Sequence, residues 1–307
     1  MCEEIDAVRL NFSEESLIFL DLTLAIIMFG VALNLRWEDF QRVISKPKIP
    51  LIGVASQFLF LPAITWVLVY FIQPCPSMAL GMFLVAACPG GNVSNFLALL
   101  SKANVALSVS LTAVATVLSI IMTPLNFTFW ASLYPPAAQM LYEDIDMDPL
   151  SIFIKVLLIL GLPLALGMWT ASRFPRFTER VHKPIQTLSL IIFAGYVFAA
   201  IFNNWEFIFK YVPYVIGIVL VHNASALLTG YMSGYLVKAP RQDRRSLSIE
   251  TGIQNSGVAL VLIFGDLFNG LGGMALIAAL WGVWHLIVGI SLASVWSRRS
   301  PVPAPEG

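Results

Sequence analysis

The sequence CPGGNVSN at residues 88–95 interrupts a long apolar stretch with groups that do not suit a continuous membrane helix. Pro89 has no backbone amide hydrogen to donate, and its ring strains the preceding turn. Gly90 and Gly91 allow the backbone to leave helical geometry at little cost. The run FLALL at 96–100 is apolar again. We therefore predict a membrane helix that is broken at this motif.

A second polar interruption, ETGIQNSG, lies at residues 250–257 and is followed by the apolar run VALVLIF at 258–264. Like the first motif, it places glycine, amide and hydroxyl groups inside an apolar stretch. Breaking a helix releases carbonyl and amide groups, which within hydrocarbon need partners from protein, water or a ligand. Released carbonyls suit a small cation, and amides at a helix N-terminus suit an anion. Two matched breaks therefore indicate a transporter binding site.

The chain around these motifs is apolar enough to cross a membrane repeatedly. Of its 307 residues, 58% are hydrophobic and 12% are charged, and the mean hydropathy is +0.81. A soluble domain has about twice that charged fraction. A membrane helix needs about 20 mostly apolar residues. We expect an all-α polytopic membrane protein with nine spans, at about 17–35, 49–72, 78–101, 104–131, 150–171, 184–203, 208–237, 246–265 and 270–296.

Basic residues gather in alternate connections between the expected spans. They lie in the segments 36–48, 102, 172–183, 238–245 and 297–307. The opposite side has Arg9, Lys155 and Lys210, with acidic residues at 1–16 and 143–148. Because basic loops face the cytoplasm, we predict an integral plasma-membrane protein with its N-terminus outside and its C-terminus cytoplasmic.

The two broken spans are five spans apart, and an odd displacement inverts the topology of the second repeat relative to the first. The predicted organisation is an extracytoplasmic N-terminus at 1–16, a first repeat at 17–149, a linking span at 150–171, a second repeat at 172–296 and a cytoplasmic tail at 297–307.

Glu250 is the decisive charged residue, because an acidic side chain inside a membrane helix is costly and usually faces a cavity or a partner. The alternative is that Glu250 lies at the membrane–water interface and not within the membrane. The polar residues expected at a similar depth are Gln57, Ser94, Asn95, Ser108 and Thr112. Ser108 and Thr112 are four residues apart and share one helix face. Such oxygen ligands suit a hard cation, and a single carboxylate fits sodium or a proton better than calcium.

With these motifs, the sequence resembles the bile acid:sodium symporter family. The resemblance is carried by CPGGNVSN (88–95), SKANVALSVSLTAVAT (101–116) and IETGIQNSG (249–257), with support from GVASQFLFLP (53–62) and VWHLIVG (283–289). It covers residues from about 22 to 296. It implies a core domain of spans two, three, four, seven, eight and nine, in which the broken helices cross, and a panel domain of spans one, five and six.

The resemblance also implies two sodium sites and a site for an organic anion. The first sodium site would use Ser94, Asn95, Ser108, Thr112 and Glu250. The second would use Gln57, Glu250 and Gln254, with the backbone carbonyls of Thr251 and Ile253. The anion, bile acid-like or a small carboxylate such as pantoate, would contact Gly91, Asn92, Asn255 and His285. Transport would proceed by alternating access, with no other cofactor.

The same residues are also compatible with other functions. Glu250 could titrate in a proton-coupled transporter, or the chain could be a sensor that binds a ligand without moving it. An intramembrane enzyme is disfavoured, since the sequence has no HExxH or GxSxG motif and no paired aspartates. A net charge of zero gives no bulk attraction to nucleic acid.

Several single residues have a plainer interpretation. Cys2, Cys75 and Cys88 show no CxxC or metal spacing, and we expect no redox role for them. His222 is expected to form a hydrogen bond between helices, and His285 could equally be a packing residue. Asn11 begins a glycosylation sequon on the expected outer side.

Overall fold

The computed structural model describes residues 2–9, 14–33, 35, 37–91, 93–144, 150, 153–154, 157–265, 267–268 and 270–298. The helices of the first half are α1 Cys2–Ala7, α2 Glu14–Ala32, α3 Trp37–Ser45, α4 Lys48–Ala55, the π-helical turn η1 Ser56–Phe60, α5 Leu61–Ile72, α6 Pro76–Ala87, α7 Val93–Leu100, α8 Val105–Ser132, α9 Pro135–Gln139 and the turn η2 Met140–Asp144. Those of the second half are the turn η3 Leu157–Gly161, α11 Leu162–Arg173, α12 Pro175–Asn203, α13 Trp205–Leu236, α14 Arg241–Gly252, α15 Ser256–Phe264 and α16 Gly272–Arg298. The described residues contain no strand, so the predicted all-α class is confirmed.

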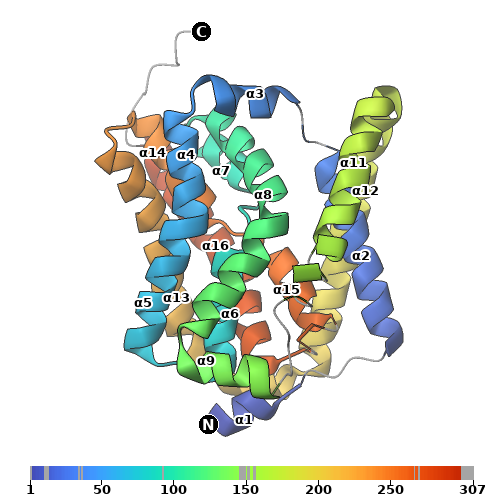
Figure 1. Ribbon diagram of the computed structural model, residues 1–307, viewed down its shortest axis with the longest axis vertical. Helices are drawn as coiled ribbons and strands as arrows, with labels where there is room; N and C mark the ends of the chain where they lie inside the picture. Colours follow the sequence, from blue (N-terminus) through green and yellow to red (C-terminus); the bar gives the residue numbers. More distant parts are fainter. Residues whose placement is uncertain are drawn as a thin grey trace.

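Long helices dominate the fold (Figure 1). The stretches long and apolar enough to cross a membrane, among the described residues, are Lys48–Ile72, Val105–Ser132, Trp205–Leu236 and Gly272–Arg298. Their outer faces carry large exposed apolar side chains such as Leu51, Leu125 and Ile287, and such faces suit lipid better than water. The chain is a multi-pass membrane protein, as its composition predicts. The total of nine spans stays a prediction.

The helix α6 lies at the centre of the packing. Every residue from Ser77 to Ala87 is buried, and α6 packs against α8 and α16. Its apolar side chains, including Phe83, belong to the main hydrophobic core. A helix that is apolar all round needs such an enclosed position or lipid. The burial of α6 places the first polar motif, which follows directly after Ala87, inside the protein.

The helices α2, α11 and α12 form a separate group. α2 packs against both of the others, and Figure 1 shows the three beside one another at one side of the molecule. They correspond to the expected spans one, five and six. Their role as a moving panel, and the inverted repeat, stay predictions that the fold does not test.

A disulfide joins Cys2 of α1 to Cys75, which immediately precedes α6. This corrects the expectation that these cysteines have no redox role. The two residues are 73 positions apart in the chain, with their Cα atoms 5.2 Å apart in the fold, so their spacing in the sequence carried no sign of the pairing. Disulfides persist in oxidising compartments. The bond is therefore consistent with an extracytoplasmic position for both residues.

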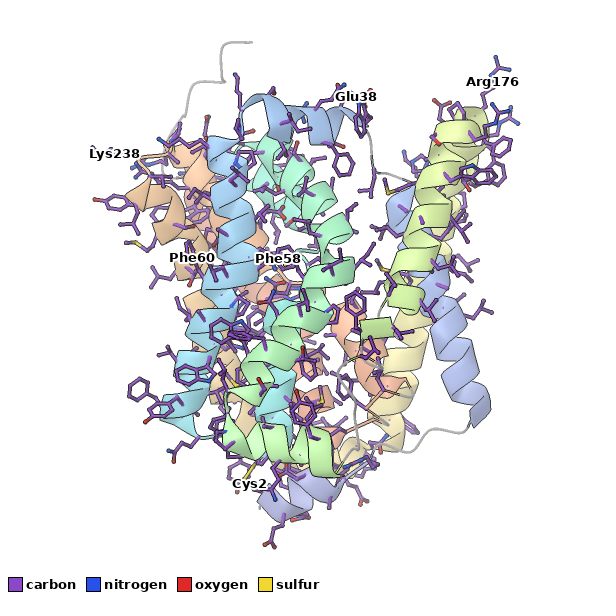
Figure 2. The ribbon with its side chains drawn as sticks, in the orientation of Figure 1. Cys2, Glu38, Phe58, Phe60, Arg176 and Lys238 are labelled. Carbon is purple, nitrogen blue, oxygen red and sulfur yellow. A yellow bond between two sulfur atoms is a disulfide. The ribbon has the colours of Figure 1, made fainter. Side chains whose placement is uncertain are left out.

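Further contacts hold α1 at the same end of the molecule. Lys210 at the start of α13 donates a hydrogen bond to Glu4, which lowers the pKa of this exposed carboxyl below its usual value. The amide of Gly272 at the start of α16 donates to the carbonyl of Val8 at 3.0 Å. Cys2 lies at the opposite end from Glu38, Arg176 and Lys238, whereas Phe58 and Phe60 lie between the ends (Figure 2).

Three basic segments predicted as loops are partly helical. Residues 36–48 contain α3, 172–183 contain the start of α12, and 238–245 contain the start of α14. Pro175 suits the first position of a helix, and acidic residues in the first turn, such as Glu38 of α3 and Asp243 of α14, favour helix formation. The residues Arg36, Lys155 and Arg299, the sequon at Asn11 and the tail 299–307 lie outside the described residues.

The disulfide allows a test of the predicted orientation. In right-side-out vesicles, a membrane-impermeant maleimide should label Cys2 and Cys75 only after treatment with an impermeant reductant, because the bond occupies both sulfur atoms. The buried Cys88 should stay unlabelled and serves as the internal control. A Cys2→Ser variant should expose Cys75 to the reagent without reductant, as read from the mass of the labelled protein. Labelling that requires inside-out vesicles would contradict the outside position of the N-terminus.

Candidate ion and substrate site

The interruptions of the two broken helices lie against each other. The segment between α6 and α7 and the segment between α14 and α15 run antiparallel and share a bridge. The amide of Gly91 donates to the carbonyl of Ile253 at 2.8 Å, and the amide of Asn255 donates to the carbonyl of Pro89 at 2.8 Å. Backbone groups released by one break are thus satisfied by the other.

Buried side chains from neighbouring helices satisfy more of the released carbonyls. The donors are Thr123 of α8 to Ala87, Gln57 of η1 to Cys88 and Asn223 of α13 to Gly252, each at 2.8 Å. We did not predict that Thr123 or Asn223 would bond these carbonyls. Their signal in the sequence is a polar side chain within an apolar span, which does not reveal its partner.

The carboxylate of Glu250 lies in a cluster of hydroxyl groups. Glu250 is 5% exposed and sits in the last turn of α14. It accepts hydrogen bonds from Ser94 of α7 and from Ser108 and Thr112 of α8, and Thr112 Oγ1 lies 3.0 Å from both of its oxygens. Thr112 Oγ1 is also 3.3 Å from Asn95 Oδ1. The structure therefore brings together all five residues predicted for the first sodium site.

The charge of this cluster has no basic partner in the described part of the chain, where the ion pairs are Arg42–Asp39 and Lys210–Glu4. A buried carboxylate surrounded by neutral dipoles favours a nearby cation strongly, because charges interact more strongly away from water. The described residues hold no group of three or more His, Cys, Asp or Glu side chains that could bind a metal. The oxygen atoms around Glu250 suit one monovalent hard cation.

The residues predicted for the second sodium site also gather beside the breaks. Gln57 Nε2 donates to Gln254 Oε1 at 2.7 Å, and Gln254 Nε2 donates to the Thr251 carbonyl at 2.7 Å. Ile253 is buried next to them and its carbonyl accepts the Gly91 amide. The Glu250 carboxylate is hydrogen-bonded to the first cluster. The structure thus groups four members of the second set and leaves the Glu250 carboxylate facing the first.

Gln57 reaches this position from the π-helical turn η1, Ser56–Phe60. The turn widens the helix between α4 and α5, and such insertions are frequent at functional sites. The Ser56 hydroxyl lies 2.9 Å from the Thr251 hydroxyl, so two successive residues of the turn contact α14 and its break. The sequence carries no clear signal for a π-helical turn.

The candidate anion ligands lie around the same breaks. Gly91 is buried, and its amide donates a hydrogen bond across the breaks. Asn255 caps α15, because its side-chain oxygen accepts a hydrogen bond from the Val258 amide at 3.3 Å. The Asn255 side-chain oxygen is therefore used by the helix, which leaves its amide nitrogen for a ligand. Asn92 lies outside the described residues.

His285 faces the breaks from α16. It is 5% exposed and shares a helix face with Gly282 and Gly289. Glycine at 282 approaches Ser256, and glycine at 289 approaches Ile253. His285 Nδ1 is buried and has no hydrogen-bond partner among the described residues.

His222 has the structural role that we predicted. Its Nε2 atom lies 2.7 Å from Thr65 Oγ1, which joins α13 to α5. Its ring packs edge-on against Trp281 of α16, with ring centroids 4.7 Å apart. The predicted hydrogen bond between helices is confirmed.

Known proteins are similar to this chain over most of its length. Residues 21–211 match the model of a family described as the Sodium Bile acid symporter family. The chain is 30% identical over 281 residues to a protein of Bacillus subtilis (strain 168) named uncharacterized sodium-dependent transporter YocS, with 92% of this chain and 84% of the relative covered. It is 31% identical over 281 residues to the probable sodium/metabolite cotransporter BASS1, chloroplastic, of Arabidopsis thaliana, covering 91% of this chain and 66% of the relative. It is 28% identical over 257 residues to the P3 protein of Homo sapiens, covering 82% of this chain and 52% of the relative.

Gly90 provides a test of how closely the breaks are packed. A β carbon at this position would lie 2.8 Å from Glu250 Oε2 and 3.2 Å from the Glu250 carbonyl. We expect Gly90→Ala to destabilise the protein by about 1–3 kcal/mol, because it forces the carboxylate out of its hydroxyl cluster. The matched control is Gly217→Ala in α13, where the added β carbon meets nothing within 4 Å and alanine favours the helix. Thermal unfolding in detergent should separate the variants; equal midpoints would refute the close packing.

Proposed function

This chain belongs to the sodium bile acid symporter family, and we propose that it is a secondary active transporter that couples sodium ions to the uptake of an organic anion. The Bacillus subtilis and Arabidopsis thaliana relatives are named as a transporter and a cotransporter, not as enzymes. The observation that carries the proposal is the buried Glu250 carboxylate. Beside the two breaks, it accepts hydrogen bonds from hydroxyl groups of α7 and α8. An ion bound there would connect both broken helices to α8.

We assign one sodium ion to the cluster of Ser94, Asn95, Ser108, Thr112 and Glu250. The hydroxyl groups that now donate to the carboxylate would turn their lone pairs toward the ion, and the carboxylate would balance its charge. A second ion is assigned to Gln57, Gln254, Glu250 and the carbonyls of Thr251 and Ile253. These carbonyls already accept one hydrogen bond each, and a carbonyl oxygen has a second lone pair to offer.

We assign the organic anion to a position near the same breaks, between the core helices and the group of α2, α11 and α12, with Gly91, Asn92, Asn255 and His285 as ligands. The helices α7 and α15 begin there, and the partial positive charges of their N-termini favour an anion. One relative is named a probable sodium/metabolite cotransporter, so we keep a small metabolite carboxylate such as pantoate as a candidate cargo beside a bile acid-like one.

The proposed mechanism is alternating access in the plasma membrane. Bound sodium would hold the breaks in one geometry, and the ordered breaks would then bind the anion. The group α2, α11 and α12 would move relative to the remaining helices and release the cargo inward. The reciprocal coupling between ion and anion would amount to about 1–3 kcal/mol.

Replacing Glu250 tests the ion site directly. Glu250→Gln keeps the shape of the side chain and removes its charge, so sodium-driven uptake should fall to the background of empty proteoliposomes. The protein should still elute as one species and unfold cooperatively. Normal sodium-driven uptake by this variant would overturn the assignment of Glu250.

A pair of threonines on α8 gives a finer test. Thr112 and Thr116 are both buried and each bonds the carbonyl four residues earlier, but Thr112 alone of the two contacts Glu250. Thr112→Val should raise the sodium concentration for half-maximal uptake about ten-fold, because the variant loses a hydrogen bond or ligand to a charged group. Thr116→Val should leave it close to the wild-type value. Equal shifts would assign the effect to helix packing.

The cargo and the coupling ion can be determined together. Proteoliposomes would receive labelled taurocholate, pantoate or pyruvate, with inward sodium and proton gradients applied separately. Accumulation driven by sodium supports the proposal and identifies the cargo class. Accumulation with protons alone would make the chain a proton-coupled transporter, and saturable binding without accumulation would make it a sensor.

A further inference from the structure

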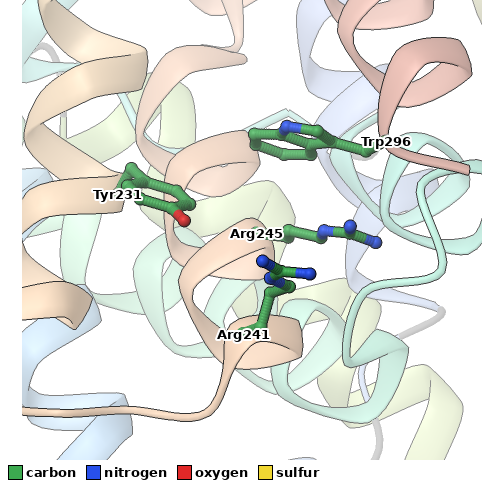
Figure 3. A pocket seen from close by; sticks show the side chains of 4 residues that line it. All are labelled: Tyr231, Arg241, Arg245 and Trp296. Carbon is green, nitrogen blue, oxygen red and sulfur yellow. The ribbon is translucent and has the colours of Figure 1, made fainter. Parts of the chain in front are cut away.

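A cavity of about 300 Å³ lies between α13, α14 and α16, away from the breaks. It is lined by Tyr231, Arg241, Arg245 and Trp296 (Figure 3). The two arginines come from the start of α14, whose other end carries Glu250. The segment 238–245 is predicted to face the cytoplasm, which places the cavity at the inner membrane surface.

Arg245 is a buried cation with neutral partners. It is 3% exposed, its Nη1 donates to the Ser101 carbonyl at 2.8 Å, and its guanidinium lies 5.6 Å from the centre of the Trp296 ring. Neither ion pair of the described part of the chain involves it. Burying a charge without a counter-charge is costly, so an anion in the cavity would stabilise this arrangement.

Arg241 adds a second positive charge to the same cavity. It lies four residues before Arg245, so both side chains project from one face of α14, where like charges repel each other. Figure 3 shows both guanidinium groups at the cavity, with the Tyr231 hydroxyl facing them. Two planar guanidinium groups with several donors each match the oxygens of a phosphate group closely.

The remaining wall is aromatic. The rings of Tyr231 and Trp296 are tilted, with centroids 6.1 Å apart. Such side chains favour the membrane–water interface, and basic pockets between helices on the cytoplasmic side bind phosphate-bearing headgroups.

We propose that this cavity is a binding site for a phosphate group, carried by an anionic phospholipid of the inner leaflet or by a small soluble phosphate compound. The site is distinct from the ion cluster and does not depend on the proposed transport function. Both sources place the same group between Arg241 and Arg245.

The test uses the purified full chain in neutral detergent and a matched pair of charge variants. Arg241→Gln removes a charge that lines the cavity. Arg244→Gln removes the same charge from the same helix, but Arg244 bonds the Ala239 carbonyl and lies over Tyr235, outside the cavity lining. Native mass spectrometry would count adducts of phosphatidylglycerol and phosphatidylcholine. The affinity for phosphatidylglycerol should fall about ten-fold or more in Arg241→Gln and stay near wild type in Arg244→Gln.

Adding inorganic phosphate distinguishes a lipid source of the phosphate group from a soluble one. If phosphate raises the unfolding temperature of the wild type, and does so less in Arg241→Gln, the site accepts a soluble phosphate. If phosphatidylglycerol binds and inorganic phosphate has no effect, the site is specific for lipid. Either result supports the proposal.

A variant of the aromatic wall checks the location. Trp296→Leu removes the ring over Arg245 and should weaken phosphatidylglycerol binding. Equal losses in Arg241→Gln and Arg244→Gln would show a general effect of surface charge and overturn the proposal. Absence of binding by both phosphatidylglycerol and inorganic phosphate would overturn it as well.

Discussion

A helix that is interrupted inside a membrane must find a partner for each backbone group that it releases. In this protein the two interruptions meet that requirement for each other, through the bonds from Gly91 to Ile253 and from Asn255 to Pro89. Side chains of η1, α8 and α13 donate to three more of the released carbonyls. Each break depends on the other, so the helices that carry them form one unit.

That unit leaves little space for side-chain volume. A β carbon at Gly90 would meet the Glu250 carboxylate, and one at Gly230 of α13 would lie 2.2 Å from the Leu247 carbonyl of α14. Close backbone approach through small residues is a common way for membrane helices to associate. Here it fixes α14 against α13 and so determines the depth and direction of Glu250.

The helix α14 carries buried charge of opposite sign near its two ends. Arg245 lies close to its start and Glu250 close to its end, and both are almost fully buried. Neutral dipoles surround each of them, namely a carbonyl and an aromatic ring for Arg245 and three hydroxyl groups for Glu250. The two ends of one helix therefore favour ligands of opposite charge, an anion at the start and a cation at the end.

The sequence by itself determined the membrane class, the all-α fold and the family, because apolar run length and the motifs at 88–95 and 249–257 are local properties of the chain. It also indicated the residues around Glu250, since a polar side chain in an apolar span needs a polar partner. Tertiary structure alone decided which partners meet: the pairing of Cys2 with Cys75, the role of Thr123 at Ala87, the π-helical turn that carries Gln57, and the cavity at Arg245. These features join residues far apart in the chain, and the packing that brings them together leaves no local pattern in the sequence.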